Sequence, residues 1–375
     1  MAWFFSIFIS IFFIVYGGAH FYIYWRLIRP LNLTGVLLHS VRLVFLLLFL
    51  SFPLFHFFFR HQNGPLVAVI NFIGSVWAGT LVYFLLAILG VGIFKLVSGM
   101  PQNPRIFSLA VTTIVLAVTV YGLIEAGNIG VTRLNVKISN LPKKLEGMTI
   151  AQISDVHMGL TVRGQRLEKI VKMVNELHPD LIVITGDLVD EQALHMEDMV
   201  KPLKELKCPY GIFAITGNHE YFAGIDKAIA FIESAGVTML RNRWVTIAGG
   251  IQLAGRDDPT GARVTDEVIP PLKDILKGTD PSKPIILLYH TPVTTFEELQ
   301  SLGVQLQLSG HTHKGQLWPF NYIVKMVYKT PYGEFISGNT TIYVSRGTGT
   351  WGPPMRVGAR PEITLVTLSS RDKEN

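Results

Sequence analysis

The first third of the chain is dominated by apolar residues that continue for about 20 positions at a time. Polar and turn-forming residues interrupt them at positions 29–32, 60–65 and 100–105. A helix of about 20 apolar residues can cross the hydrocarbon core of a bilayer, and short breaks favour antiparallel neighbours. The pattern therefore predicts a four-helix transmembrane bundle in residues 1–125, with spans at Trp3–Trp25, Val36–Phe59, Leu66–Phe94 and Ile106–Ile124.

A cleaved signal peptide is the alternative for the first apolar run. That run has no basic start, and three further spans follow it. Both features argue against a secretory leader.

Beyond Glu125 the pattern changes to short β-like runs that alternate with helical stretches. Such alternation predicts a layered α/β architecture with a largely buried sheet, as a second domain over residues 126–375. The predicted strands are Val131–Ser139, Met148–Ser154, Leu181–Thr185, Gly211–Thr216, Ile285–Tyr289, Val304–Ser309, Ile342–Ser345 and Ile363–Leu368. The predicted helices are Gln165–Leu177, Met196–Leu206 and Asp226–Ala235.

Composition agrees with a chain that lies partly in lipid. Apolar residues make up 49% of the 375 positions and the mean hydropathy is +0.38, both high for a wholly soluble protein. Residues 1–125 hold six Lys or Arg and a single acidic residue, so they carry almost all of the net charge of +6. The nearly neutral remainder excludes a basic face for nucleic acid. A single cysteine, Cys208, excludes an internal disulfide.

The distribution of Lys and Arg gives an orientation, because basic loops tend to stay in the cytoplasm. The first and third loops are basic, whereas only Arg60 marks the second. This predicts that both termini face outward and that the second domain is extracytoplasmic. The basic residues that follow the last span, Arg133, Lys137, Lys143 and Lys144, favour the opposite orientation.

Three histidines, His20, His39 and His56, lie in or near the spans. Paired histidines in a four-helix bundle can ligate haem. No bis-His spacing repeats across these helices, which favours interhelical or interfacial hydrogen bonding instead.

Five polar motifs follow five of the predicted strands directly. Loops at strand ends are where α/β proteins build their sites. Any one of the motifs would be an ordinary polar turn, but five in one domain predict a common site. They are Asp155-Val156-His157, Gly186-Asp187, Gly217-Asn218-His219-Glu220, His290 and Gly310-His311-Thr312-His313.

These residue types indicate metal chemistry. Positions two apart in an extended segment project to the same side, so Asp155 can converge with His157, and His311 with His313. Carboxylate, carboxamide and imidazole ligands without thiolate favour Mn, Fe or Zn over a structural zinc site. The ligands are too many for one ion, so we expect two divalent ions roughly 3.5–4 Å apart, bridged by a carboxylate. Such a pair activates a shared water for in-line displacement at phosphorus.

In this order the motifs resemble those of the calcineurin-like metallophosphoesterase family, over about Val131 to Leu368. The resemblance implies a four-layer αββα sandwich with a binuclear centre bridged by Asp187. It also implies a proton-donating or charge-stabilising His219 near the leaving group, with Asp190 and Glu220 supporting the ligands. The implied ligands are Asp155, His157, Asp187 and His313 for one metal, and Asp187, Asn218, His290 and His311 for the other.

Further segments resemble a bacterial membrane-associated branch of phosphodiesterases and proteins similar to UDP-2,3-diacylglucosamine hydrolase. These segments are Gly255–Asp258, Tyr289–Pro292, Gly315–Leu317, Tyr343–Gly349 and Arg356–Glu362. Lys314 departs from that branch, which usually has Gly there. Its ammonium is a candidate contact for a substrate phosphate.

Arg346 and Arg360 are further candidate substrate contacts, although a loop arginine more often forms a surface ion pair. Arg356 has the same two readings. Asp257 and Asp258 either orient ligands or form an ordinary turn. Five aromatic residues form either a lipid-facing rim or core packing; they are Trp318, Phe320, Tyr322, Tyr328 and Trp351.

The sequence thus predicts a metal-dependent phosphoric ester hydrolase in the inner membrane of a bacterium, acting most plausibly on a phosphodiester of a lipid or lipid-linked substrate. A phosphomonoester stays open, as do the native metals and the oligomeric state. One alternative is a non-catalytic membrane protein that uses the fold as a binding module, which would show lost ligands. Another is a regulated transporter, but the spans contain no Asp or Glu before Glu125.

Overall fold

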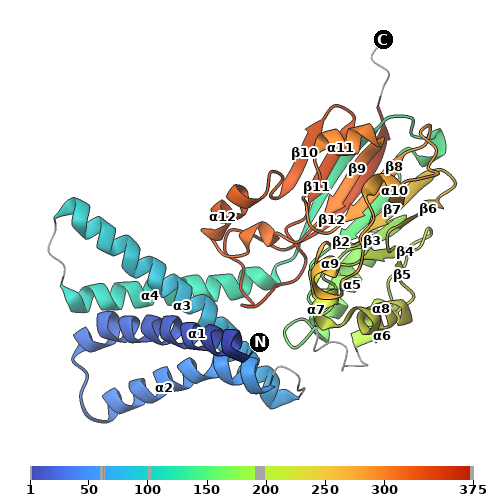
Figure 1. Ribbon diagram of the computed structural model, residues 1–375. Helices are drawn as coiled ribbons and strands as arrows, with labels where there is room; N and C mark the ends of the chain where they lie inside the picture. The colour runs from blue at the N-terminus through green and yellow to red at the C-terminus, as the bar shows by residue number, and fades with distance from the viewer. Residues whose placement is uncertain (1, 60–61, 63, 100–102, 191–198, 372–375) are drawn as a thin grey trace. The chain divides into compact units, whose positions relative to one another are not determined.

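The computed structural model describes residues 2–59, 62, 64–99, 103–190 and 199–371. They divide into two units. A helical unit comprises Met1–Ile124 and Gly352–Met355, and a mixed α/β unit comprises Glu125–Trp351 and Arg356–Asn375. Each unit has its own architecture (Figure 1).

Within the described residues the helical unit contains four helices that are long and apolar enough to cross a membrane. They are α1 (Ala2–Ile23), α2 (Gly35–Leu54), α3 (Pro65–Ser98) and α4 (Pro104–Gly127). Proline opens α3 and α4, where its missing N–H costs nothing, and left-handed Gly99 closes α3. The prediction of four apolar N-terminal helices is confirmed.

Polar side chains connect these helices. The indole N–H of Trp77 on α3 donates to His20 Nε2 on α1 at 2.7 Å, and His20 Nδ1 lies 2.7 Å from the Tyr16 carbonyl. The hydroxyls of Thr80 and Thr119 join α3 to α4 at 3.1 Å. Both ring nitrogens of His20 are therefore engaged, which supports interhelical hydrogen bonding and leaves neither nitrogen for a haem iron.

Two six-stranded sheets form the α/β unit. The first has the order β1-β12-β2-β3-β4-β5. Strands β2 to β5 are parallel, β12 is antiparallel to β2, and β1 is parallel to β12. The bounds are β1 Gly130–Ile138, β2 Thr149–Ile153, β3 Leu181–Thr185, β4 Ile212–Ile215, β5 Thr238–Met239 and β12 Glu362–Ser370.

The second sheet has the order β10-β11-β9-β8-β7-β6. Strands β11, β9, β8 and β7 are parallel, and an antiparallel strand closes each edge. The bounds are β6 Arg243–Ile247, β7 Ile251–Arg256, β8 Ile285–Tyr289, β9 Val304–Ser309, β10 Gly333–Ser337 and β11 Thr340–Val344.

Helices cover the outer faces of both sheets, so the unit has four layers. The inner faces meet in one core, in which Ile150 and Val183 of the first sheet join Ile286 and Leu306 of the second. Outside the first sheet pack α5 (Gln165–Glu176), α6 (Val200–Leu203) and α8 (Ile225–Ser234). Outside the second pack α10 (Leu272–Ile275) and α11 (Phe296–Ser301). The αββα prediction is confirmed.

All eight predicted strands are present, and four further strands, β5, β6, β7 and β10, complete the sheets. Of the predicted helix Met196–Leu206, Val200–Leu203 forms α6, residues 204–206 are not helical, and residues 196–198 lie outside the described part of the chain. Five short helices of the described residues were not predicted: α7 (Asn218–Ala223), α9 (Thr260–Val264), α10, α11 and α12 (Phe320–Val327).

Candidate metal centre

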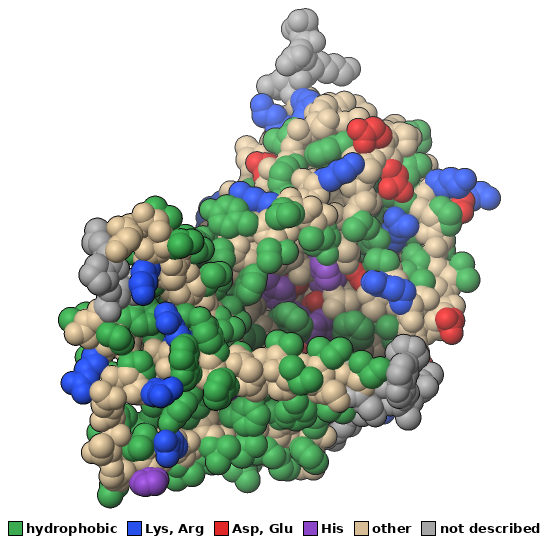
Figure 2. All heavy atoms as spheres, turned by 60° about the vertical axis from the view of Figure 1, so that its left-hand side comes forward, with side chains coloured by type: hydrophobic (Ala, Val, Ile, Leu, Met, Phe, Trp, Pro, Cys, Tyr) green, Lys and Arg blue, Asp and Glu red, His purple; other side chains and the backbone are tan. Residues whose placement is uncertain are grey.

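The five motifs follow the ends of five strands that lie at the middle of the two sheets. Asp155, Asp187 and Asn218 follow β2, β3 and β4 of the first sheet, while His290 and His311 follow β8 and β9 of the second. The three strands of the first sheet are parallel to one another, and so are the two strands of the second. The carboxyl ends of each set therefore lie at the same edge of their sheet. Figure 2 shows histidine and acidic side chains gathered at one place on the α/β unit.

The backbone at these positions is held in an uncommon conformation. Positive φ is rare for residues with a side chain and costs about 1–3 kcal/mol, so it persists where surrounding structure imposes it, often at functional sites. Five of the seven predicted ligands adopt it: Asp155 at 53°, His157 at 51°, Asp187 at 51°, His311 at 72° and His313 at 48°.

Two glycines are needed because side chains of the site approach their backbone closely. A Cβ on Gly217 would lie 2.2 Å from Asp187 Oδ1. On Gly310 it would lie 2.3 Å from Asp155 Oδ2. Both distances are far below van der Waals contact, so glycine before each motif admits the carboxylates of the neighbouring strands.

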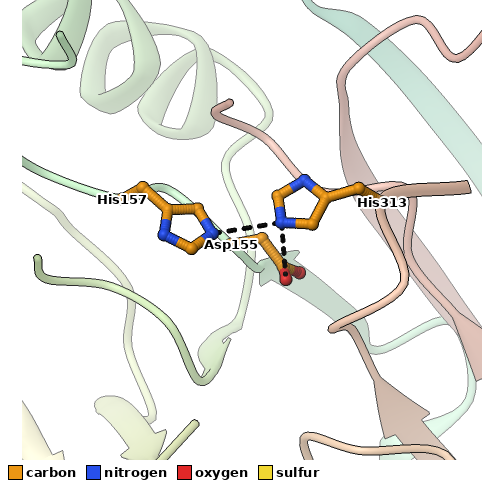
Figure 3. Close-up of side chains that lie close together, drawn as sticks. All are labelled: Asp155, His157 and His313. Carbon is orange, nitrogen blue, oxygen red and sulfur yellow. Dashed lines mark hydrogen bonds and ion pairs between the residues drawn. The ribbon is translucent and has the colours of Figure 1, made fainter. Parts of the chain in front are cut away.

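One group of candidate ligands consists of Asp155, His157 and His313, all buried. His313 Nε2 lies 3.3 Å from Asp155 Oδ1 and 3.0 Å from His157 Nε2 (Figure 3). At least one of these two facing nitrogens must present a lone pair, because two N–H groups cannot point at each other at this distance. The converging donors fit a cation.

A second group consists of Asp187, His290 and His311. His290 Nε2 lies 3.1 Å from Asp187 Oδ2 and 3.3 Å from His311 Nδ1. The Asn218 carboxamide oxygen lies 2.9 Å from His311 Nδ1 and brings an uncharged ligand to the group. The His290 Nδ1–H donates to the Thr185 carbonyl at 2.7 Å, which leaves Nε2 to face the centre.

Asp187 lies between the two groups. Its Oδ2 is 3.8 Å from His157 Nε2 in the first group and 3.1 Å from His290 Nε2 in the second. Burial opposes ionisation, but the imidazoles of His290 and His219 outweigh it and hold the pKa of this carboxyl well below its usual range. Asp187 is therefore placed and charged as a bridging ligand requires.

His219 and Asp190 lie beside this centre. The Asp190 carboxylate accepts from His219 Nδ1 at 2.7 Å and from His157 Nδ1 at 3.0 Å. Burial would lower the pKa of His219, but the charge of Asp187 and the bond to Asp190 raise it to about 9. Phe222 and Trp351 flank the His219 ring in edge-on contacts. The structure thus places an imidazole that its acidic neighbours favour in the protonated form at the margin of the ligand cluster.

Glu220 supports the loops that carry the ligands. Its side chain is fully buried and accepts four backbone N–H bonds, from Gly217 at 2.7 Å, Asp187 at 3.0 Å, Leu188 at 2.8 Å and Val189 at 3.1 Å. Burial and the charge of Asp187 raise its pKa, while the bonds from Gly217 and Val189 oppose that shift. This single carboxylate fixes the loops after β3 and β4 to each other.

Arg356 was predicted as a substrate contact or a surface ion pair, and the structure corrects both readings. Its side chain is fully buried and donates to the carbonyls of Gly349 at 2.6 Å, Arg346 at 2.7 Å and His313 at 3.1 Å. Burial lowers its pKa to about 9. Its place beside the His313 ring, at 3.1 Å from Nδ1, makes it a positioning residue for that histidine.

The three predicted substrate contacts have partners within the chain. The Lys314 ammonium lies 5.1 Å from the centroid of the Tyr332 ring. Arg346 pairs with Glu362, donating from Nε at 2.9 Å, and Arg360 donates to the Asn128 carbonyl at 2.9 Å. Their role in substrate binding stays a prediction.

The carboxylates of Asp257 and Asp258 hold the fold together rather than orient the candidate metal ligands. Asp257 accepts from Arg241 Nε at 2.9 Å, and Asp258 caps the turn into α9 by accepting from the Thr260 N–H at 2.9 Å. Three of the five predicted aromatic residues, Trp318, Tyr322 and Trp351, are more than half exposed, so they are not core.

Comparison with known proteins agrees with this geometry. The family profile "Calcineurin-like phosphoesterase" matches residues 148–315. An uncharacterized metallophosphoesterase of Aquifex aeolicus is 35% identical over 67% of this chain and 96% of its own length. One from Campylobacter jejuni is 30% identical over 98% of this chain and 99% of its own. A zebrafish relative named "Transmembrane protein with metallophosphoesterase domain" is 35% identical over 69% of this chain, which spans 61% of it.

The chain therefore belongs to the calcineurin-like phosphoesterase family, as its motifs indicated. It is a membrane protein with a metal-dependent phosphoester hydrolase domain. Proteins of this family depend on two metal ions, and the two ligand groups of the structure are the candidates for holding them.

Proposed function

We propose that the chain hydrolyses a phosphate ester, most plausibly a phosphodiester, of a lipid or lipid-linked substrate at a membrane surface. Residues 1–125 serve as the anchor and residues 126–375 as the catalytic domain, which lies outside the cytoplasm of a bacterial cell. The observation that carries the chemistry is the position of Asp187 between the two ligand groups, 3.8 Å from His157 and 3.1 Å from His290.

The residues of the chain divide the work. Asp155, His157 and His313 would hold one divalent ion, Asn218, His290 and His311 would hold the other, and Asp187 would contribute to both. When bound, Mn, Fe or Zn ions supply charge that activates water and stabilises the phosphoryl oxygens. His219 donates a proton to the leaving oxygen, because its ring lies beside the ligand groups and Asp190 fixes its orientation. A binding module without catalysis would not need this donor.

The experiment that tests this proposal uses the purified full-length chain. Its hydrolysis of soluble phosphomonoesters, soluble diesters and vesicle phospholipids is assayed with chelator and then with added Mn, Zn, Fe or Mg. We expect chelation to abolish turnover and one or more of Mn, Zn and Fe to restore it. Metal uptake without hydrolysis of any substrate would favour the binding-module alternative, whereas turnover unaffected by chelator would overturn the binuclear centre.

Replacing His219 by Ala should lower kcat by about 10²- to 10⁴-fold, the usual contribution of a general acid, while metal content changes little. Turnover and bound metal are measured on the same preparations. His178→Ala is the matched control, because His178 is exposed and lies on the connection after α5. If His219→Ala lost metal in proportion to activity, His219 would be a ligand rather than a proton donor.

The lipid surface is proposed from α12, which follows the His311–His313 loop after a short connection. It carries exposed Tyr322, Ile323, Met326 and Val327, with Met326 85% exposed. Exposed Trp318 precedes it, and the helix also carries Lys325. An apolar face with aromatic and basic residues is typical of helices that lie in a bilayer interface. The tether to membrane helices makes a bilayer the available partner.

Placing a charge on this face tests the lipid surface. Met326→Glu should reduce kcat/KM on an anionic vesicle substrate by roughly tenfold, since burying a Met side chain contributes about 1.5–3 kcal/mol. A soluble diester should be affected much less. Ile336→Glu is the control, because Ile336 is also exposed, at 61%, but lies on β10. Equal losses on vesicle and soluble substrates would count against the membrane contact.

A further inference from the structure

The helical unit contains a basic pocket that the phosphoesterase chemistry does not use. It has a volume of about 370 Å³, within the range of small-ligand sites. The stretch after α1, the end of α3 and the start of α4 surround it. Its lining includes Trp25, Arg26, Arg29, Lys95, Pro104 and Phe107. On the face drawn in Figure 2, Lys and Arg side chains gather on one part of the helical unit, and hydrophobic side chains are spread over the rest of that face.

The three cations of this pocket have no acidic neighbour in their own part of the chain. Residues 1–124 contain no Asp or Glu, and Gly352–Met355, which completes the unit, is uncharged. Like charges gathered around one cavity repel each other unless an anion neutralises them. The compensating charge must therefore come from outside this unit.

Arg26 gives the pocket a built polar group. It lies in a π-helical turn, Tyr24–Ile28, and its guanidinium packs on the Phe107 ring at 5.4 Å from the centroid. Among the described residues its Nε is buried without a hydrogen-bond partner. An unsatisfied buried donor costs about 1–3 kcal/mol, more when charged, so an acceptor in the pocket would be bound with a gain. Single π-helical turns are often found at functional sites.

We propose that this pocket binds a phosphate-bearing anion, either the head group of an anionic phospholipid or free phosphate. Arg26 and Arg29 offer paired N–H donors that match phosphate oxygens, and Lys95 adds a point charge. Trp25 is exposed beside them, as aromatic residues are at the head-group level of a bilayer. The apolar spans on either side favour the lipid as the source.

The pocket and the metal centre share no residue, because the lining of the pocket belongs to the helical unit and the candidate metal ligands belong to the α/β unit. Pro104 lines the pocket at the first residue of α4, and that helix runs 24 residues to Gly127 before the α/β unit begins its first strand. Binding here can therefore be measured on a chain whether or not that chain hydrolyses phosphate esters.

The test uses full-length protein, delipidated in a neutral detergent, and native mass spectrometry with three probes. These are dioctanoyl phosphatidylglycerol, dioctanoylglycerol, which lacks the phosphate, and inorganic phosphate. We expect phosphatidylglycerol to bind and dioctanoylglycerol not to bind. Arg26→Gln with Lys95→Gln should weaken binding roughly 25-fold, because each cation near a membrane contributes about fivefold. Arg42→Gln, which removes a cation that packs on Tyr24 instead, should change it less than twofold.

The inorganic phosphate probe shows whether the pocket binds free phosphate or the head group of a lipid. Inorganic phosphate that displaces the lipid at low millimolar concentration would assign the pocket to free phosphate, and no displacement would assign it to the head group. Equal binding of both dioctanoyl lipids, or unchanged binding by the double variant, would overturn the proposal. If the double variant lost its helical circular dichroism, Lys95→Gln alone and the loss of wild-type binding in high salt would decide the question.

Discussion

Asp187→Asn should reduce metal-dependent hydrolysis by roughly 10³-fold or more while the chain stays folded. The carboxylate lies between two groups of ligands, and its charge is the one that both metal ions would share. Losing about 4 kcal/mol of transition-state stabilisation corresponds to this factor, since each 1.36 kcal/mol is tenfold in rate. Asparagine keeps the shape of the side chain and one of its oxygens. Its Oδ1 can therefore still accept a hydrogen bond from the backbone N–H of His219, which lies 2.8 Å from Asp187 Oδ1 in the wild-type chain.

The measurement is kcat/KM on a soluble diester at saturating metal, with bound metal and the unfolding midpoint determined on the same samples. Asp226→Asn on α8 is the matched control, because Asp226 is exposed and belongs to none of the motifs. Activity retained within tenfold would remove Asp187 from the bridging position, and unfolding of the variant would instead make it a structural residue.

Hydrophobic patterning predicts the fold where an element has a strong period or a long apolar run. The four membrane helices and the parallel strands that lead to the motifs belong to this class, since continuous apolar runs are typical of strands buried on both faces. Three of the four missed strands, β5, β6 and β10, are weaker signals. β5 has only two residues, and β6 and β10 are edge strands whose partly exposed residues include Arg243 and Glu334. Tertiary pairing rather than local sequence determines them.

The helix predicted over Met196–Leu206 shows the opposite error. Its apolar spacing continues to Leu206, although α6 ends at Leu203 and Cys208-Pro209 follows shortly after. α6 is accordingly only four residues long. Proline removes a helical N–H bond, so a regular spacing alone was an insufficient guide here.

The candidate ligands could be selected from the sequence because strand ends and residue types are both visible in it, whereas the groups that position these side chains were not visible. The left-handed backbone at Asp155 and Asp187 results from tight loops fixed by the sheets. The Arg356 guanidinium donates hydrogen bonds to the backbone carbonyls of His313, Arg346 and Gly349. Backbone acceptors have no sequence signature, so a buried arginine in a loop looks like a surface one. The positioning role of Arg356 is therefore visible only in the structure.

Glu220 is another residue whose positioning role is visible only in the structure. Of the substitutions proposed, its replacement should lower the free energy of unfolding the most. Glu220→Ala leaves four buried N–H groups without an acceptor, those of Gly217, Asp187, Leu188 and Val189. Each unsatisfied buried donor costs about 1–3 kcal/mol, and relaxation of the loops and entry of water recover part of this. We expect the free energy of unfolding of the α/β unit to fall by about 3–5 kcal/mol.

Metal binding should weaken together with stability in this variant, because the same N–H groups fix the loops that carry Asp187 and Asn218. Denaturant unfolding of the full-length chain, followed by the signal of the α/β unit, gives the loss. Glu176→Ala is the control: the Glu176 side chain is 62% exposed and pairs only across a helical turn with Lys172, so its loss should change stability by less than about 0.5 kcal/mol. Glu220→Gln separates charge from shape. Its amide offers one acceptor oxygen instead of two, so it should lie between wild type and Glu220→Ala, and a Gln variant as stable as wild type would show that the four bonds contribute little.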